Sequence, residues 1–195
     1  MARTIAKDHG DKRGQILAKA AHVFARDGFD KASMSQIAEA CGISKANIYH
    51  YYRGKDALLF DLLDGYLSAL RERVIAADDP GLSTEERFRH TLREILLAYQ
   101  GADDEHRIQM SGLGGLPDDQ QQILRGYQRD LVRHLSDLLH ACAPDRLSDK
   151  KTLRATTMSV FGMLNWYFMW NGGSGAKARE DYADLVADLT LNGVR

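Results

Sequence analysis

Proline and cysteine are scarce in this 195-residue chain, and each scarcity narrows the possible protein classes. The three prolines, at positions 80, 117 and 144, leave long stretches in which helices can form without interruption. The two cysteines, Cys41 and Cys142, are too few for a disulfide framework. The N-terminal residues include no apolar signal region, so we expect a reduced, cytoplasmic setting.

Long hydrophobic runs are also missing. The most apolar stretch, residues 158–170, is shorter than the roughly 18 residues that a membrane-spanning helix needs. It is further interrupted by Ser159, Gly162 and Asn165. We therefore interpret this stretch as a buried helix and expect no membrane partner.

The net charge of the chain is close to zero, but positive and negative residues are distributed unevenly along the sequence. The whole sequence carries a net charge of −1. Residues 1–56 hold ten Lys and Arg against six Asp and Glu, whereas residues 57–195 hold sixteen against twenty-one. A basic N-terminal part on an acidic remainder suits a polyanionic partner, such as double-stranded DNA, for the N-terminal part.

Helical periodicity runs through nearly the whole sequence. Apolar residues recur every three to four positions, and no segment alternates with a period of two, so the pattern predicts an all-α protein with about nine helices. We expect the chain to begin with a loose polar arm over residues 1–11. The expected helices then cover approximately residues 11–27, 33–41, 44–52, 55–77, 83–100, 104–111, 118–141, 148–170 and 178–192.

The second and third of these helices form a helix-turn-helix pattern. Ser33 and Gln36 have the spacing of a capping box, which predicts a helix start at Ser33. Gly42 ends this helix and supplies the tight turn, and Ser44 caps the next helix. In that short helix Ile48 is the main apolar anchor, so most of its other side chains are left to face outward.

The outward residues have the chemistry of DNA recognition. Lysine can pair with guanine, an alanine methyl can touch thymine, and asparagine can pair with adenine in the major groove. A solvated surface helix with two packed aromatic rings is the alternative interpretation of the same pattern. The predicted contacts to bases or phosphates are Ser33, Ser35, Ser44, Lys45, Ala46, Asn47, Tyr49, His50 and Lys55.

The segment from Gln15 to Leu59 resembles the DNA-binding head of TetR-family transcriptional repressors. The matching pieces are "AA..F...GF", "S.S.IA.A.GIS...IY.YY" and "KDALL". The sequence departs from the family at Cys41, where a small residue such as alanine is common, and at Tyr52, where phenylalanine is usual. The resemblance implies a helix-turn-helix domain over residues 10–56 and a ligand-binding and dimerisation domain over residues 57–195.

The resemblance also implies a homodimer that binds a pseudo-palindromic operator and is released by a small-molecule effector. In this family the last two long helices usually form the dimer contact, and the helix at 55–77 couples effector to DNA. A buried helix in the core is the alternative for the apolar stretch at 158–170. The predicted dimer contacts are Met158, Phe161, Leu185, Val186 and Leu189.

The effector site is predicted from apolar stripes of the middle helices. The segment "MLNWYFMWN" is similar to acyl-CoA-responsive repressors, which control fatty-acid, steroid or phenylacetate catabolism. A drug-like cation or an aromatic acid is the alternative effector, and plain core packing is the alternative for each residue. The candidate lining residues are Phe88, Leu92, Leu96, Met110, Leu113, Tyr127, Leu131, Leu164, Trp166, Tyr167 and Trp170, and the candidate phosphate anchors are Arg107, Arg125, Arg129 and Arg154.

No catalytic motif accompanies these features. The sequence has no G-x-S-x-G motif, no P-loop and no G-x-G-x-x-G after a strand, so we expect no enzyme activity. His134 and His140 are six positions apart and off a common helix face, so we expect no metal and no cofactor. We expect Cys41 to be a buried, inert thiol. A helical interaction protein or enzyme that keeps the helix-turn-helix as a scaffold remains the second hypothesis.

Overall fold

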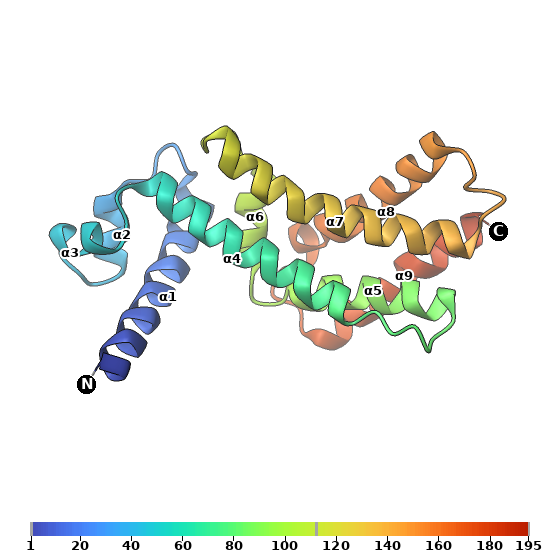
Figure 1. Cartoon of the computed structure of the whole chain (residues 1–195), viewed down its shortest axis with the longest axis horizontal. Helices are drawn as coiled ribbons and strands as arrows, with labels where there is room; N and C mark the ends of the chain where they lie inside the picture. The colour runs from blue at the N-terminus through green and yellow to red at the C-terminus, as the bar shows by residue number, and fades with distance from the viewer. Residues whose placement is uncertain (1, 112, 195) are drawn as a thin grey trace. The chain divides into compact units, whose positions relative to one another are not determined.

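The computed structural model describes residues 2–111 and 113–194, and over these residues the chain forms nine α-helices and no strand (Figure 1). The all-α prediction is therefore confirmed. The helices are α1 (Ala2–Asp27), α2 (Met34–Ala40), α3 (Lys45–Tyr51), α4 (Lys55–Ala76), α5 (Thr84–Ala98), α6 (Asp103–Ser111), α7 (Asp118–Cys142), α8 (Lys150–Asn171) and α9 (Ala176–Val194).

The nine helices divide between two compact units. The first unit comprises Met1–Tyr66 together with Asp104–Leu124, and the second comprises Leu67–Asp103 together with Arg125–Arg195. Helices α4 and α7 therefore contribute residues to both units. The functional boundary at residue 56 remains a prediction, because compactness divides the chain by contacts and not by function.

The first unit is built on a small apolar core under α2 and α3. Apolar side chains from α1 through α4 are buried there because each helix turns one stripe inward. Helix α3 contributes a single buried side chain to this core, Ile48. The buried apolar residues of these four helices up to position 63 are Ile16, Ala20, Ala21, Val23, Phe24, Met34, Ile37, Ala38, Ile48, Leu58, Leu59, Leu62 and Leu63.

Capping residues fix the ends of the two short helices. Ser33 and Gln36 form the predicted capping box: the Gln36 amide N–H donates to Ser33 Oγ at 3.3 Å, and the Ser33 N–H donates to Gln36 Oε1 at 2.9 Å. Ser44 Oγ accepts from the Asn47 N–H at 3.1 Å and starts α3. Between the helices, Gly42 has a φ of 64°, which a residue with a side chain adopts only with strain.

The beginning of the chain differs from the prediction. The loose polar arm expected over residues 1–11 is wrong for its described part, because α1 already begins at Ala2. Residues 2–11 contain no proline, and extending an existing helix costs far less than nucleating a new one. The polar composition of this segment does not prevent helix formation.

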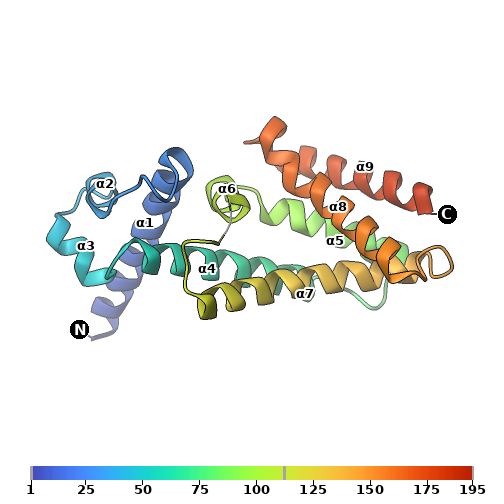
Figure 2. The same ribbon diagram turned by 90° about the horizontal axis from the view of Figure 1, so that it is seen from above.

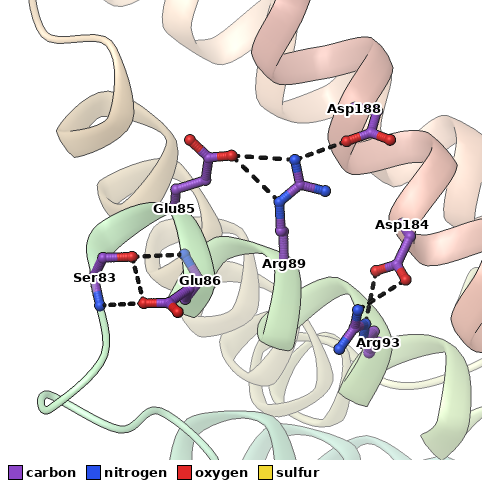
Figure 3. Close-up of polar contacts among 7 residues, drawn as sticks. All are labelled: Ser83, Glu85, Glu86, Arg89, Arg93, Asp184 and Asp188. Carbon is purple, nitrogen blue, oxygen red and sulfur yellow. Dashed lines mark hydrogen bonds and ion pairs between the residues drawn. The ribbon is translucent and has the colours of Figure 1, made fainter.

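In the second unit, α5 packs along α9 and both contact α8 (Figure 2). The apolar stripe of α5 is buried, and ion pairs border it on the side of α9. Arg89 Nη2 lies 2.7 Å from Asp188 Oδ1, and Arg93 Nε lies 2.7 Å from Asp184 Oδ1 (Figure 3). Because these arginines stand one helical turn apart, the two pairs fix the register between α5 and α9.

A buried arginine closes the other end of this helix pair. Arg179 of α9 is 1% exposed, and its guanidinium donates to the carbonyl oxygens of Ser174 and Leu96 at 3.1 and 3.3 Å. A third bond reaches Asp103 Oδ1 at 3.4 Å. A charge in the interior is tolerated only with such partners, so Arg179 ties α9 to the end of α5 and to the connection after α8.

Candidate nucleic-acid interface and effector region

Helix α3 presents a polar outer surface over one apolar anchor. Ile48 is fully buried, whereas Lys45, Ala46, Asn47, Tyr49 and His50 are exposed. Because α3 has only seven residues and buries only Ile48, most of its remaining side chains face outward. The structure thus brings five of the predicted contacts onto one short exposed helix.

The start of α2 adds hydroxyl groups to the same unit. Ser33 and Ser35 are both exposed, as is the α3 cap Ser44. The hydroxyls of Ser33 and Ser44 are engaged in capping, because each accepts a backbone N–H of its own helix. Ser35 has no capping role and is the better placed of the three to offer its hydroxyl to a ligand.

Lys55, the first residue of α4, makes a contact that the sequence did not predict. Its Nζ donates to the carbonyl oxygens of Phe29 and Asp30 at 2.9 and 3.0 Å, and it stands 4.5 Å from the centre of the Phe29 ring. These bonds link residues 25 and 26 positions apart. The ammonium group therefore holds the loop after α1 against the start of α4.

The same loop is contacted by the glycine-rich connection between α6 and α7. A Cβ atom on Gly115 would lie only 2.8 Å from Phe29 Cε1, closer than side-chain carbons approach. Phe29 in turn meets Phe24 edge-to-face, with ring centres 5.3 Å apart. The absence of a side chain at Gly115 is what allows the connection to pack on Phe29, and this role differs from the phosphate cradle that glycine-rich loops can form.

Three helices meet at the Tyr52 hydroxyl, and sequence reasoning missed this cluster. Arg13 Nε of α1 donates to Tyr52 Oη at 3.0 Å, and the Tyr52 hydroxyl donates to Asp61 Oδ2 of α4. Arg13 also binds Asp61 directly, at 3.0 Å through Nε and 2.8 Å through Nη2. The signal that could have found it is the tyrosine at a position where the family usually has phenylalanine.

Another polar pair of the first unit lies beneath α6. His106 is fully buried, and its Nδ1 lies 3.1 Å from Tyr66 Oη of α4. At the same end of α6, Asp104 Oδ2 lies 3.2 Å from His22 Nδ1 of α1. Residues 104–111 thus bind both α1 and α4 through side chains.

Burial divides the predicted effector residues into two groups. Phe88, Leu92, Leu96, Leu131, Leu164 and Tyr167 are buried in the second unit, and Leu113 is buried in the first. Tyr127 is partly buried. The exposed members are Met110, Trp166 and Trp170, and the predicted anchors Arg107, Arg125, Arg129 and Arg154 are exposed as well. Their role as effector contacts stays a prediction.

Large apolar side chains are exposed on α8 and α9. Along α8 the exposed members fall within one side of the helix, and on α9 they stand one turn apart. We call this set the α8–α9 apolar face, and its members are Met158, Trp166, Met169, Trp170, Leu185 and Leu189. Of the predicted dimer contacts, Phe161 and Val186 are instead buried within the unit.

A shallow groove lies between these two helices. It has a volume of about 280 Å³ and is lined by Thr156, Ser159, Val160, Met163, Leu189, Thr190 and Gly193. None of the predicted effector residues lines it. Leu189 belongs to both the groove and the α8–α9 apolar face, so the two features are continuous.

Other predicted features can be located on the described residues. Cys41 is partly buried, and this burial raises the pKa of its thiol, which keeps it in the unreactive protonated form. Over residues 2–111 and 113–194, no group of three His, Cys, Asp or Glu side chains is arranged to hold a metal ion. Within the same ranges, the helices are all too short or too polar to span a membrane.

Two family models match this chain. Residues 16–62 match the model described as bacterial regulatory proteins, tetR family. Residues 81–194 match the model described as tetracyclin repressor-like, C-terminal domain. Together these matches include α2 and α3 in the first model and α5 through α9 in the second.

Individual relatives agree with the family models. A TetR-family transcriptional regulator from Bordetella parapertussis 12822 has a crystal structure with a TM-score of 0.87 and 32% identity, covering 92% of this chain and 94% of that one. The HTH-type transcriptional repressor Rv1474c of Mycobacterium tuberculosis (strain ATCC 25618 / H37Rv) is 33% identical over 88 residues, 38% of this chain and 47% of that protein. This chain therefore spans about half the length of that curated relative.

A third likeness is one of fold. The crystal structure of AibR in complex with isovaleryl coenzyme A and operator DNA has a TM-score of 0.77 at 23% identity. The similarity covers 91% of this chain and 97% of that one. The same fold thus occurs in a protein whose crystal structure contains isovaleryl coenzyme A and operator DNA.

Proposed function

This chain belongs to the TetR family of bacterial regulatory proteins, which are regulators of transcription and not enzymes, and we propose that it represses transcription as a ligand-responsive dimer on a pseudo-palindromic operator. The observation that carries this proposal is α3, a capped seven-residue helix with one buried anchor and an exposed polar surface. Such a helix gains little by burial, so its side chains are available for base edges.

In the proposed complex, the N-terminal end of α3 enters the major groove. Lys45 reads guanine, Asn47 reads adenine, and the Ala46 methyl touches thymine. Tyr49 and His50 contact a phosphate or a base edge on the same face. The exposed hydroxyl of Ser35 and the start of α2 bind phosphate, while Ser33 and Ser44 hold the helix ends in place.

The ammonium group of Lys55 is not free to bind a phosphate directly in the structure. Its ammonium is bonded to the carbonyl oxygens of Phe29 and Asp30. The positive charge still lies at the start of α4, where the first backbone N–H groups also favour an anion. Lys55 therefore contributes to phosphate binding mainly through the field at the helix start and through the position of the loop that it holds.

A second copy of the chain is the proposed occupant of the α8–α9 apolar face. Six large apolar side chains exposed on two adjacent helices form a patch of the kind that monomers rarely display. A two-fold axis lets such a face pair with itself, and the groove beside Leu189 offers room for a side chain of the second copy. The two α3 helices of the dimer then read half-sites about 34–36 Å apart, which is one turn of DNA.

The proposed effector is a small apolar molecule, and an acyl-CoA is the first candidate. The fold shared with AibR, which binds isovaleryl coenzyme A, supports this choice, as does the aromatic end of α8. A drug-like cation or an aromatic acid is the alternative. An effector lowers operator affinity only by binding more tightly to the conformation that does not fit DNA, and α4, which has residues in both units, is the proposed connection.

A salt titration of DNA binding tests the regulator itself. Duplexes are first selected from a randomised pool with the purified protein, and binding is then measured at several salt concentrations. We expect a palindromic consensus, tight binding and a steep linear fall of log affinity with log salt. Binding without sequence preference would instead favour a helical protein that keeps the helix-turn-helix as a scaffold.

A ligand panel tests the effector. Free coenzyme A, short and long acyl-CoAs, aromatic acids and cationic dyes are added to the protein with and without the selected duplex. We expect an acyl-CoA to raise the melting temperature of the protein and to release the duplex. If an aromatic acid or a dye does so and every thioester fails, the alternative effector class replaces the acyl-CoA.

A further inference from the structure

The Tyr52 hydroxyl connects the C-terminal end of α3, the proposed recognition helix, to α1 and α4. Tyr52 is the C-cap of α3, and its backbone N–H donates to the Ile48 carbonyl at 3.0 Å. Its side chain is buried, and the hydroxyl accepts a bond from Arg13 of α1 and donates one to Asp61 of α4. The end of the proposed recognition helix is thus bonded to both of its supporting helices through one oxygen atom.

The hydroxyl, and not the aromatic ring, makes this connection. A phenylalanine at position 52 would fill the same core volume but could neither accept from Arg13 nor donate to Asp61. Burial and the bond to Asp61 raise the pKa of Tyr52 to about 12, so the phenol stays protonated and remains a donor at neutral pH. Arg13 completes the cycle, since its guanidinium reaches Asp61 through two nitrogen atoms.

We propose that Tyr52, Arg13 and Asp61 form a positioning group that sets the angle of α3 and so determines how well the protein distinguishes its operator from other DNA. This inference rests on the proposed DNA-reading function of α3. The residues of the group need not touch DNA. They act at the C-terminal end of α3, whereas the proposed base contacts Lys45 to Asn47 stand about 9 Å away at the N-terminal end, at 1.5 Å per residue.

An error in this angle affects base contacts and phosphate contacts differently. Bidentate pairing of a side chain with a base edge requires matched distances and planes, whereas a cation attracts a phosphate over a wider range of positions. Loss of the hydroxyl should therefore lower specific affinity while leaving non-specific affinity nearly unchanged. A hydroxyl that serves only stability would lower the melting temperature and leave the ratio of the two affinities intact.

The first test compares Tyr52→Phe with the wild-type chain on two duplexes. One duplex is selected from a randomised pool by the wild-type protein, and the other has the same composition in scrambled order. We expect Tyr52→Phe to lose about tenfold in affinity for the selected duplex, which corresponds to about 1.4 kcal/mol. Affinity for the scrambled duplex and the salt dependence of binding should stay as in the wild type.

Tyr99→Phe is the matched control. Tyr99 is 5% exposed and Tyr52 is 4% exposed, and the Tyr99 hydroxyl donates to Asn165 Oδ1 at 2.8 Å within the second unit. This substitution removes a buried hydroxyl from a place with no proposed contact to α3. We expect it to lower the melting temperature and to leave the ratio of the two affinities unchanged. An equal loss of discrimination in Tyr99→Phe would overturn the proposal.

Arg13→Lys keeps the test decisive even when Tyr52→Phe folds poorly. Arg13 lies half exposed, and lysine preserves its charge while removing the planar fork that reaches both partners. We expect a loss of discrimination of roughly threefold to tenfold, and no further loss when the two substitutions are combined. Unchanged discrimination in Arg13→Lys, or additive losses in the double variant, would refute a shared positioning role.

Loss of DNA reading and loss of the positioning role would give different results. If the wild-type protein selects no duplex from the pool, the proposed DNA-reading function is wrong and the positioning group has no function to serve. If the wild type selects a duplex and Tyr52→Phe selects it with equal discrimination, only the positioning group is wrong.

Discussion

Helix α3 exposes a surface of polar side chains, whereas helices α8 and α9 expose a surface of large apolar side chains. Helix α3 shows Lys45, Asn47 and His50 over a single buried isoleucine. Helices α8 and α9 show tryptophan, methionine and leucine side chains while burying a second apolar stripe inside the unit. The first surface suits a charged, hydrated polymer, and the second suits another protein surface.

The two surfaces differ in how unusual each one is on a folded protein. A polar surface is ordinary on any protein, so α3 becomes informative only through its short length, its single anchor and its place in a helix-turn-helix. An exposed apolar surface is unusual in itself, so α8 and α9 are informative without any motif. Substitutions on one surface at a time can separate the proposed roles of the two surfaces.

The largest effect is expected from a charge on the apolar face. Leu189→Glu places a carboxylate at a side chain that is 59% exposed in one chain and that the proposed dimer covers. Burial of an unpaired carboxylate at both copies should cost several kcal/mol, so we expect a monomer with operator affinity reduced at least a hundredfold. Sedimentation velocity and operator titration measure the two results.

Leu82→Glu is the control for that substitution. Leu82 is also an exposed leucine of the second unit, but it lies in the turn before α5 and outside the apolar face. We expect it to leave both the oligomeric state and the operator affinity unchanged. A dimeric Leu189→Glu protein would show that the apolar face is not the dimer contact.

A smaller effect is expected on the polar side of the comparison. Asn47→Ala removes an amide from the exposed end of α3 without touching the buried Ile48. We expect a loss of about 1–3 kcal/mol at the selected duplex and relaxed selection at one base pair of each half-site. Gln100→Ala removes an exposed amide from the second unit. It should leave the affinity for the selected duplex and the base-pair selection unchanged. Uniform weakening on all sequences would reassign Asn47 to a phosphate contact.

Gly115→Ala tests a packing contact inside the first unit. The new methyl group would meet Phe29 at about the 2.8 Å that a Cβ would have, so either the loop or the ring must move. We expect the free energy of unfolding to fall by about 1–2 kcal/mol, as overpacking does elsewhere. Gly114→Ala meets nothing within 4 Å and should leave stability unchanged or slightly raised. Urea titration of both variants decides whether the contact matters.

The smallest effect is expected from the ion pairs between α5 and α9. The hydrogen bond from Arg93 holds the pKa of Asp184 below its ordinary value, so the pair contributes stability above the ordinary aspartate pKa of 3.8. That contribution is lost as the pH falls through the lowered value, when the carboxylate is protonated in the folded chain. Because both side chains are partly exposed, Asp184→Asn should cost only about 0.2–1 kcal/mol at neutral pH.

The pH dependence provides the check on that substitution. Thermal unfolding of the wild type and of Asp184→Asn should differ at neutral pH and converge in acid. Asp181→Asn, which removes a carboxylate that pairs with Lys177 inside α9 alone, should show no such difference. A gap between wild type and Asp184→Asn that persists in strong acid would mean that packing, and not the ion pair, causes it.

Local rules predicted the helix-turn-helix well because its signals are local. The caps at Ser33 and Ser44 and the turn at Gly42 depend on residues within four positions, and the structure has them as predicted. The predicted start of α8 at position 148 is early, because Asp149 caps the helix and Lys150 is its first residue. Contacts across long separations were out of reach, as with Lys55 and Phe29, 26 positions apart.

Apolar stripes were informative about helices but not about what covers them. Helix α8 is apolar on two sides, so its periodicity could not separate buried Phe161 from exposed Met158. The same ambiguity affected the effector residues, where Phe88 is fully buried and Trp166 is largely exposed. A side chain's neighbours on other helices determine its burial, and a single sequence does not contain that information.

The buried guanidinium of Arg179 makes the docking of α9 depend on other parts of the second unit. It needs the Leu96 carbonyl of α5, the Ser174 carbonyl of the connection after α8, and Asp103 before α9 can dock without a stranded charge. The packing of α9 is therefore coupled to the folded positions of α5 and of the connection after α8. Since α9 also carries Leu185 and Leu189 of the α8–α9 apolar face, the bonds of Arg179 also hold this part of the face in place.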